Sequence, residues 1–253
     1  MRYDFAVIGD PIEHSKSPFL FNKIWSEHFM NKQFTYCRIN VNKDQLEDFL
    51  KKTHLIGFNV TAPLKEFIIP YLSKLTPAAE KIKAVNTVVK VGNQWHGHNT
   101  DGDGFWDMFS ANISGPKKNS DICILGNGGA ARAVTYSLNE RGYKGVVLCR
   151  SKKGNFVWPE ILFRSIKKMK ASAVIQCTTL GMHPATENRP LCPIWKGEDM
   201  PLAIDLIYNP NKTKFLLEME SLGCKTLGGS QMLTFQAKKA WEYWANVLNI
   251  PHI

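Results

Sequence analysis

Polar residues interrupt the apolar strands of the first half of this sequence in four short clusters, and their types suit the binding of a small polar molecule. In the first cluster, Ser15 and Ser17 follow an expected strand at residues 5–8 and open an expected helix at residues 17–29. Hydroxyl donors at the positive end of a helix bind a carboxylate well. Taken alone, Ser17 is more often a simple N-cap, so both interpretations stand at this point.

The second cluster combines two polar strand residues with a lysine. Asn59 and Thr61 stand two apart on an expected strand at residues 56–61, so their side chains share one face. Polar side chains in such an apolar strand need partners. Lys65 follows where the strand ends, the place where α/β sheets bind ligands. A lysine is protonated at neutral pH, so Lys65 can act as a cation or a proton donor.

The third and fourth clusters contain Asn86 and Asp101. Asn86 offers a donor and an acceptor to a polyol, and Asp101 offers a carboxylate that could pair with Lys65. A turn asparagine and a helix-capping aspartate are the alternatives. His96 and His98 stand two apart on a strand, but no third ligand follows at a convincing spacing, so we expect no metal.

The second half of the chain opens on a short apolar strand, residues 122–125, followed by a turn of the sequence Gly-Asn-Gly-Gly-Ala-Ala. Gly126 permits a tight turn, and Gly128 lets the backbone approach a pyrophosphate. The following helix points its free N–H groups at the phosphates. A strand at residues 145–149 completes a β-α-β unit, so this context predicts a dinucleotide site rather than a merely structural turn.

The end of the second strand of this unit indicates which dinucleotide binds. Enzymes that use NAD usually carry an acidic residue there, for the ribose hydroxyls. This chain has Cys149 there, followed by Arg150, Ser151, Lys152 and Lys153. With no carboxylate and three cations, a 2′-phosphate is favoured, so we predict NADP, with Arg150 best suited to grip the phosphate.

Composition narrows the class of protein. The 253 residues carry a net charge of +10, and residues 104–230 hold 17 Lys and Arg against 10 Asp and Glu. An anionic cofactor explains part of that bias. The basic residues are not interleaved with aromatics as in a nucleic-acid-binding module, so we expect no nucleic-acid partner.

The six cysteines are scattered, which predicts free thiols rather than disulfides or zinc ligands. There is no run of 18 apolar residues and no signal-peptide pattern, so we expect no membrane association and a cytoplasmic location. A monomer or a homodimer would fit this sequence.

Strands and helices alternate along the chain, which predicts two α/β units, each with a parallel sheet. Residues 87–98 form an expected hairpin around Gly92-Asn93. Helices are expected at residues 159–170 and at residues 230–248.

Seven motifs, taken together, resemble the shikimate dehydrogenase family from end to end. They are Ser15-Lys16-Ser17-Pro18, Asn59-Val60-Thr61 with Lys65, Ala84-Val85-Asn86-Thr87, Asn99-Thr100-Asp101-Gly102, Gly126-Asn127-Gly128-Gly129-Ala130, Asp205-Leu206-Ile207-Tyr208-Asn209-Pro210, and Met232-Leu233 with Gln236. Each motif alone is weak, whereas seven in this order and at these spacings form a strong signal.

The resemblance implies the reversible reduction of 3-dehydroshikimate to shikimate by NADPH, in the shikimate pathway and without a metal. It implies Lys65 and Asp101 as the catalytic pair. The substrate would contact both of these and also Ser15, Ser17, Asn59, Thr61, Asn86, Tyr208 and Gln236. NADP would contact Gly126, Gly128, Gly129, Ala130, Arg150, Ser151, Lys152, Leu206 and Gly229.

The implied fold has a substrate-binding domain, residues 1–103 plus 231–253, and a Rossmann-like NADP-binding domain, residues 104–230, with a cleft between them. The last helix returns to the first domain because Gln236 must reach the substrate. Domain closure over the cleft is expected from such an arrangement.

Departures from the family pattern lie mostly near the cofactor, at Cys149, Ser151, Cys177 and Gln231. Two alternatives stay open. One is a quinate/shikimate dehydrogenase using NAD. Lys16 and the absence of an acidic residue at position 149 are evidence against this alternative. The other is a non-catalytic cofactor or metabolite sensor on the same fold, which the departures motivate.

Overall fold

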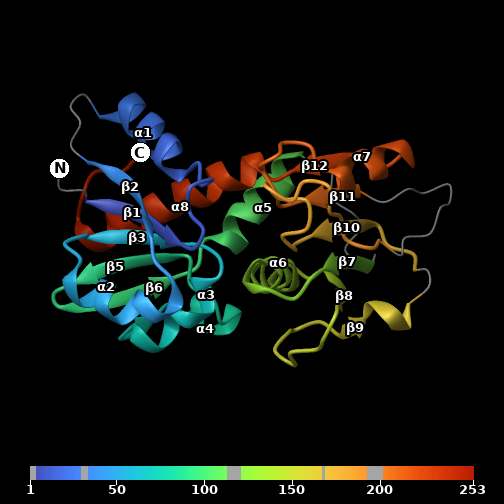
Figure 1. The fold of residues 1–253 in the computed structure, drawn as a ribbon, viewed down its shortest axis with the longest axis horizontal. Helices are drawn as coiled ribbons and strands as arrows, with labels where there is room; N and C mark the ends of the chain where they lie inside the picture. Colours follow the sequence, from blue (N-terminus) through green and yellow to red (C-terminus); the bar gives the residue numbers. More distant parts are fainter. Residues whose placement is uncertain (1–3, 30–33, 113–120, 167–168, 193–201) are drawn as a thin grey trace. The chain divides into compact units, whose positions relative to one another are not determined.

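The computed structural model describes residues 4–29, 34–112, 121–166, 169–192 and 202–253. The chain divides into two compact units, residues 1–104 with 234–253 and residues 105–233, each built on its own six-stranded sheet (Figure 1). The predicted two-domain α/β class is confirmed. In the described ranges, no helix is both long enough and apolar enough to cross a membrane.

The sheet of the first unit has the strand order β2-β1-β3-β5-β6-β4. Its strands are β1 (Phe5–Gly9), β2 (Tyr36–Asn40), β3 (Gly57–Val60), β4 (Lys74–Leu75), β5 (Thr87–Val91) and β6 (Gln94–His98). β1 is parallel to β2 and β3, whereas β5 is antiparallel to both β3 and β6. The sheet is therefore mixed rather than parallel as predicted, because the hairpin of β5 and β6 reverses the chain direction within it.

Helices cover both faces of this sheet. They are α1 (Ser17–His28), α2 (Leu46–Lys52), α3 (Leu64–Phe67), α4 (Pro77–Ile82) and α8 (Ser230–Leu248), with short 3-10 turns at Lys43–Gln45 and Ile69–Tyr71. Successive side chains of a strand point to opposite faces. Phe5 of β1 accordingly packs with Trp25 of α1 and Trp244 of α8, whereas Ala6 joins a second core with Leu46 of α2. These two cores fix β1 and the strands beside it.

The sheet of the second unit is fully parallel and has the order β12-β11-β10-β7-β8-β9. Its strands are β7 (Asp121–Leu125), β8 (Lys144–Cys149), β9 (Glu160–Leu162), β10 (Ala173–Gln176), β11 (Leu202–Asp205) and β12 (Thr226–Gly228), and its helices are α6 (Gly129–Glu140), α7 (Lys214–Ser221) and most of α5 (Asp101–Asn112). Counted from β7, the order is 3-2-1-4-5-6, that of Rossmann dinucleotide-binding sheets. The order of strands reverses between β7 and β10.

The helix predicted at residues 159–170 is wrong. Residues 160–162 form β9, which pairs in parallel with β8, and a 3-10 turn at Phe163–Ser165 follows. Ile161 and Phe163 pack against the core of the second unit. Pairing with the open edge of β8 and burying these apolar side chains outweighs the local helical pattern, and residues 167–168 lie outside the described ranges.

Candidate active site

The topology of the first unit places most of the predicted substrate residues near the carboxyl ends of the strands β1 and β3. β2 and β3 lie on opposite sides of β1, so the two crossover connections diverge between β1 and β3. Open α/β sheets bind ligands at the carboxyl ends of strands where the order diverges in this way. Ser15 and Ser17 follow β1, and Asn59 lies near the carboxyl end of β3.

Ser15 and Ser17 are both buried, at 4% and 6% exposure. The residue before α1 is Lys16, and Ser17 is the first helical residue, with no side-chain cap bond. The interpretation of Ser17 as an N-cap is therefore wrong. The Ser17 amide donates to Ser15 Oγ at 3.4 Å, and Arg38 Nε donates to the carbonyl of Ser15 at 2.8 Å, which fixes this loop beside β2.

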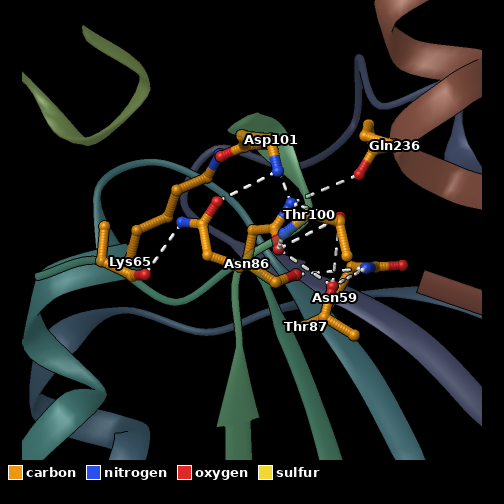
Figure 2. A network of polar contacts seen from close by, with 9 residues as sticks. Asn59, Lys65, Asn86, Thr87, Thr100, Asp101 and Gln236 are labelled. Carbon is orange, nitrogen blue, oxygen red and sulfur yellow. Dashed lines mark hydrogen bonds and ion pairs between the residues drawn. The ribbon is translucent and has the colours of Figure 1, made fainter. Parts of the chain in front are cut away.

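Asn86 is the centre of a buried hydrogen-bond network in the first unit (Figure 2). Its Nδ2 lies 2.8 Å from Asp101 Oδ1, 2.9 Å from Thr100 Oγ1 and 3.4 Å from Gln236 Oε1. Its Oδ1 accepts from the Thr100 amide at 2.8 Å and from Thr87 Oγ1 at 2.9 Å. Residues from three separate parts of the chain thus fix one another, as buried polar groups require.

Lys65 and Asp101 form an ion pair at the edge of this network. Lys65 Nζ lies 2.6 Å from Asp101 Oδ2, and the side chains are 19% and 7% exposed. The first turn of α3 carries Lys65, and the first residue of α5 is Asp101, whose amide donates to Asn99 Oδ1 at 3.0 Å. The two carboxylate oxygens are therefore divided between Asn86 and the ammonium group, which fixes the direction in which the lysine is held.

Asn59 links β3 to this network. Its Nδ2 donates to the Asn86 carbonyl at 3.1 Å and to Thr87 Oγ1 at 3.2 Å, and its Oδ1 accepts from Tyr36 Oη at 2.7 Å. Thr61 follows β3 and is half-buried, with its amide donating to the Ile8 carbonyl at 2.9 Å. The amide hydrogens of Asn59 are engaged inside the unit, so a ligand would meet its remaining acceptor capacity.

Sequence reasoning assigned no role to four residues that fix this site. Thr87 and Thr100 are part of the recognised motifs, yet the buried Asn86 amide depends on both. Tyr36 and Arg38 lie two apart on β2, and they fix Asn59 and Ser15 respectively. Neither β2 residue had a sequence signal, because a tyrosine in an apolar strand is typical of core packing.

The two histidines considered as metal ligands have other surroundings. His98 Nδ1 lies 2.8 Å from Thr76 Oγ1, and its ring packs on Tyr243 with centroids 4.5 Å apart. Burial lowers the pKa of His98, and Asp103 opposes that shift. Across the described ranges, no three or more His, Cys, Asp or Glu side chains are gathered as metal ligands would be.

The glycine-rich turn of the second unit fits a dinucleotide pyrophosphate. Gly126 has φ of +100°, and a Cβ there would lie 2.6 Å from Thr178 Cγ2 after β10, so the turn needs glycine. Gly128 precedes α6, and within the described residues no side chain caps this helix. A Cβ at Gly128 would meet no atom within 4 Å. The turn and the uncapped helix end lie where the strand order reverses, next to Gly129 and Ala130.

The rest of the predicted cofactor residues lie at the carboxyl ends of neighbouring strands. Arg150, Ser151 and Lys152 follow β8 and are exposed. Leu206 and Gly229 lie together, because a Cβ at Gly229 would come within 2.2 Å of the Leu206 carbonyl oxygen.

Two predicted residues stand apart from these groups. Tyr208 belongs to the second unit, and its contact with substrate stays a prediction. At the departure from the family pattern, Gln231 Oε1 accepts from Asn112 Nδ2 at 2.5 Å.

Known proteins resemble the chain over nearly its full length. The family model described as shikimate dehydrogenase substrate binding domain matches residues 7–88. A Bacillus cereus protein named shikimate dehydrogenase (NADP(+)) is 35% identical over 262 residues, which cover 96% of this chain and 93% of that relative.

Solved structures agree with these relatives. The crystal structure of shikimate dehydrogenase 1 from Peptoclostridium difficile is 32% identical, with a TM-score of 0.85 over 97% of this chain and 92% of that one. Shikimate 5-dehydrogenase from Thermus thermophilus, in complex with NADP(H) and shikimate, is 28% identical, with a TM-score of 0.81 over 97% and 94%. Since sequence and fold match along both units, the chain belongs to the shikimate dehydrogenase family.

Proposed function

We propose that this chain catalyses the reversible, NADPH-dependent reduction of 3-dehydroshikimate to shikimate. The observation that carries the proposal is the Lys65–Asp101 pair, 2.6 Å apart and fixed by buried amides at the carboxyl end of a sheet. The reaction is inferred from the membership of this chain in a family of NADP-dependent shikimate dehydrogenases. We also propose that residues 1–103 with 231–253 bind the substrate and that residues 104–230 bind NADP.

Lys65 is the proton donor in this proposal. NADPH, when bound, supplies the hydride that reduces the C3 carbonyl. Negative charge then develops on the carbonyl oxygen, and an ammonium group already in position stabilises it and donates a proton from Nζ. In the reverse direction, the Lys65 amine takes the proton from the substrate hydroxyl.

Asp101 and Asn86 position the lysine. Asp101 Oδ2 accepts from Lys65 Nζ, and Asn86 Nδ2 fixes the other carboxylate oxygen. Because these donors and acceptors are in place before substrate binds, little reorganisation accompanies the charge change. Ser15 and Ser17, at the start of α1, would bind the substrate carboxylate, whereas Asn59, Thr61, Asn86, Asp101 and Gln236 would contact the ring hydroxyls.

Initial rates with matched substrates and cofactors test this function. We expect shikimate with NADP to give the highest kcat/KM of the four combinations of shikimate or quinate with NADP or NAD. Equal or higher rates with quinate or NAD would replace the proposal with the broader quinate/shikimate activity. Ligand-induced stabilisation without any NADPH formation would instead indicate a sensor.

Location and assembly are further proposals. None of the six cysteines forms a disulfide, which supports the reducing cytoplasm as the location. We propose a monomer or homodimer that acts without a nucleic-acid partner. Light scattering of the purified protein at several concentrations measures the assembly state.

A further inference from the structure

The loop that follows β8 is organised by a glutamate from the next strand. Residues 160–162 form β9 instead of the predicted helix, and Glu160 is the first residue of that strand. β9 pairs in parallel with β8, with Glu160 opposite Val147. The glutamate therefore lies beside the strand that leads into Arg150, Ser151 and Lys152, on which the prediction of NADP rests.

The Glu160 carboxylate joins two loops. Its Oε1 accepts from Asn127 Nδ2 at 2.9 Å and from the Lys153 amide at 3.0 Å. Its Oε2 accepts from the Lys153 amide at 3.1 Å and from the Gly154 amide at 2.5 Å. Asn127 Nδ2 also donates to the Ser151 carbonyl at 2.7 Å. The glycine-rich turn and the loop after β8 are thus tied together through one side chain.

These contacts leave the carboxylate little capacity for a ligand. A carboxylate has about four acceptor sites, and three N–H groups make four contacts with this one, because the Lys153 amide is shared between both oxygens. Desolvation raises the pKa of Glu160, but the hydrogen bonds from Asn127, Lys153 and Gly154 outweigh it and lower the pKa below its ordinary value. The group is therefore ionised at neutral pH, and charge-assisted hydrogen bonds are the stronger kind.

The hydrogen bonds that Glu160 accepts bear on the choice of cofactor. In NAD enzymes, an acid at the end of the second strand accepts from the ribose hydroxyls. Glu160 lies close to that position but is already bound by backbone and amide donors. We propose that Glu160 is a positioning residue that holds the loop of residues 150–154 against the glycine-rich turn, and so sets the preference for a 2′-phosphate. This inference rests on the proposed use of NADP.

Binding measurements with Glu160→Gln and Glu160→Ala test the inference. The probes are NADP, NAD, and the fragments 2′,5′-ADP and 5′-AMP, titrated calorimetrically into the full chain. In Glu160→Gln, the side-chain NH2 group would face the backbone N–H donors, and Glu160→Ala has no acceptor at all. We therefore expect both variants to weaken NADP and 2′,5′-ADP binding about tenfold. NAD and 5′-AMP affinities should change less than twofold, because neither carries the 2′-phosphate. Glu187→Gln is the matched control, since this exposed glutamate of the same unit pairs with Lys214.

A double-mutant cycle separates positioning from general stabilisation. If Glu160 acts by holding the loop that carries Arg150, Glu160→Gln should cost less than twofold in NADP affinity once Arg150 is already changed to Gln. Additive effects, or equal losses for NADP and NAD, would overturn the inference. If the Glu160 variants fail to fold, Asn127→Ala replaces them. It removes one donor to the carboxylate and should give a smaller loss of NADP affinity.

The wild-type protein distinguishes this inference from the function on which it rests. If it binds NADP no better than NAD, the proposed cofactor is wrong whatever the variants do. If it prefers NADP and Glu160→Gln keeps the same ratio of affinities, only the role given to Glu160 is wrong.

Discussion

The two candidate sites are built from different parts of the chain. In the first unit, buried side chains such as Asn59, Asn86 and Asp101 bond to one another and form the site. In the second unit, a backbone turn and the exposed side chains after β8 do so. Losing a member of a buried network leaves its partners unsatisfied, whereas exposed charges are screened by salt. Changes in the first site should therefore affect turnover or shikimate binding, and changes in the second should affect cofactor affinity.

The largest difference between the effect on turnover and the effect on ligand binding is expected for Lys65→Ala. Loss of a positioned proton donor should lower kcat by about 10² to 10⁴-fold, while shikimate still binds. Steady-state rates with saturating NADP, together with calorimetric titration of shikimate, measure the two effects. Lys74→Ala, at an exposed position of β4, is the control. Near-normal kcat in Lys65→Ala would remove Lys65 from the chemistry.

A buried acid of the second unit offers a comparison with Asp101, which has a lysine partner. Asp205 accepts from Thr213 Oγ1 at 2.6 Å and from the Ile207 amide at 2.9 Å. Burial raises its pKa to about 6, although both hydrogen bonds oppose that shift. Because the folded-state pKa is raised, the ionised group destabilises the fold above pH 6, and this cost disappears as pH falls towards 4.

Asp205→Asn should remove this pH dependence. Relative to the wild type, the free energy of unfolding of the variant should rise by about 2 kcal/mol between pH 4 and pH 7. Urea unfolding of both proteins across this range measures the difference. A difference that stays constant with pH would show that Asp205 does not titrate in this window.

Substitutions at two glycines of one turn test whether the backbone of that turn forms the second site. Gly128→Ala introduces a Cβ into open space, so the free energy of unfolding should hardly change. The same Cβ would obstruct a pyrophosphate, so the KM for NADP should rise about tenfold, or about 1.4 kcal/mol. Gly126→Ala is the counterpart, because its φ of +100° and the contact with Thr178 should destabilise the fold itself. Unchanged NADP affinity in Gly128→Ala would separate this turn from the cofactor.

The features that sequence predicted well were those with local signatures. The order glycine turn, helix and strand around Gly126 depends on short-range sterics, and the β-α-β unit with its dinucleotide site was predicted from it. Lys65 and Asp101 were paired in advance because a carboxylate can pair with an ammonium group, and because the family resemblance implied both as the catalytic pair. Their 2.6 Å contact agrees with that expectation.

The features that the sequence did not predict depend on the pairing of strands that are far apart along the chain. Residues 159–170 have a helical pattern, but the open edge of β8 captures residues 160–162 as a strand. The parallel pairing of β1 and β3 could not be read from the spacing of residues, nor could the antiparallel place of β5 in that sheet. Tyr36 was missed for the same reason, since its hydroxyl finds Asn59 only once β2 lies beside β1.

The smallest predicted effect concerns Tyr36, which ties an edge strand of the first unit to its buried site. Its ring stacks on Phe21 with centroids 4.4 Å apart, so Tyr36→Phe keeps the packing and removes only the hydroxyl that donates to Asn59. Loss of one such hydrogen bond costs about 1 kcal/mol. We expect a several-fold rise in the KM for shikimate, with the KM for NADP unchanged, in steady-state kinetics. Equal changes in both KM values would mean that Tyr36 acts on the whole protein rather than on the orientation of Asn59.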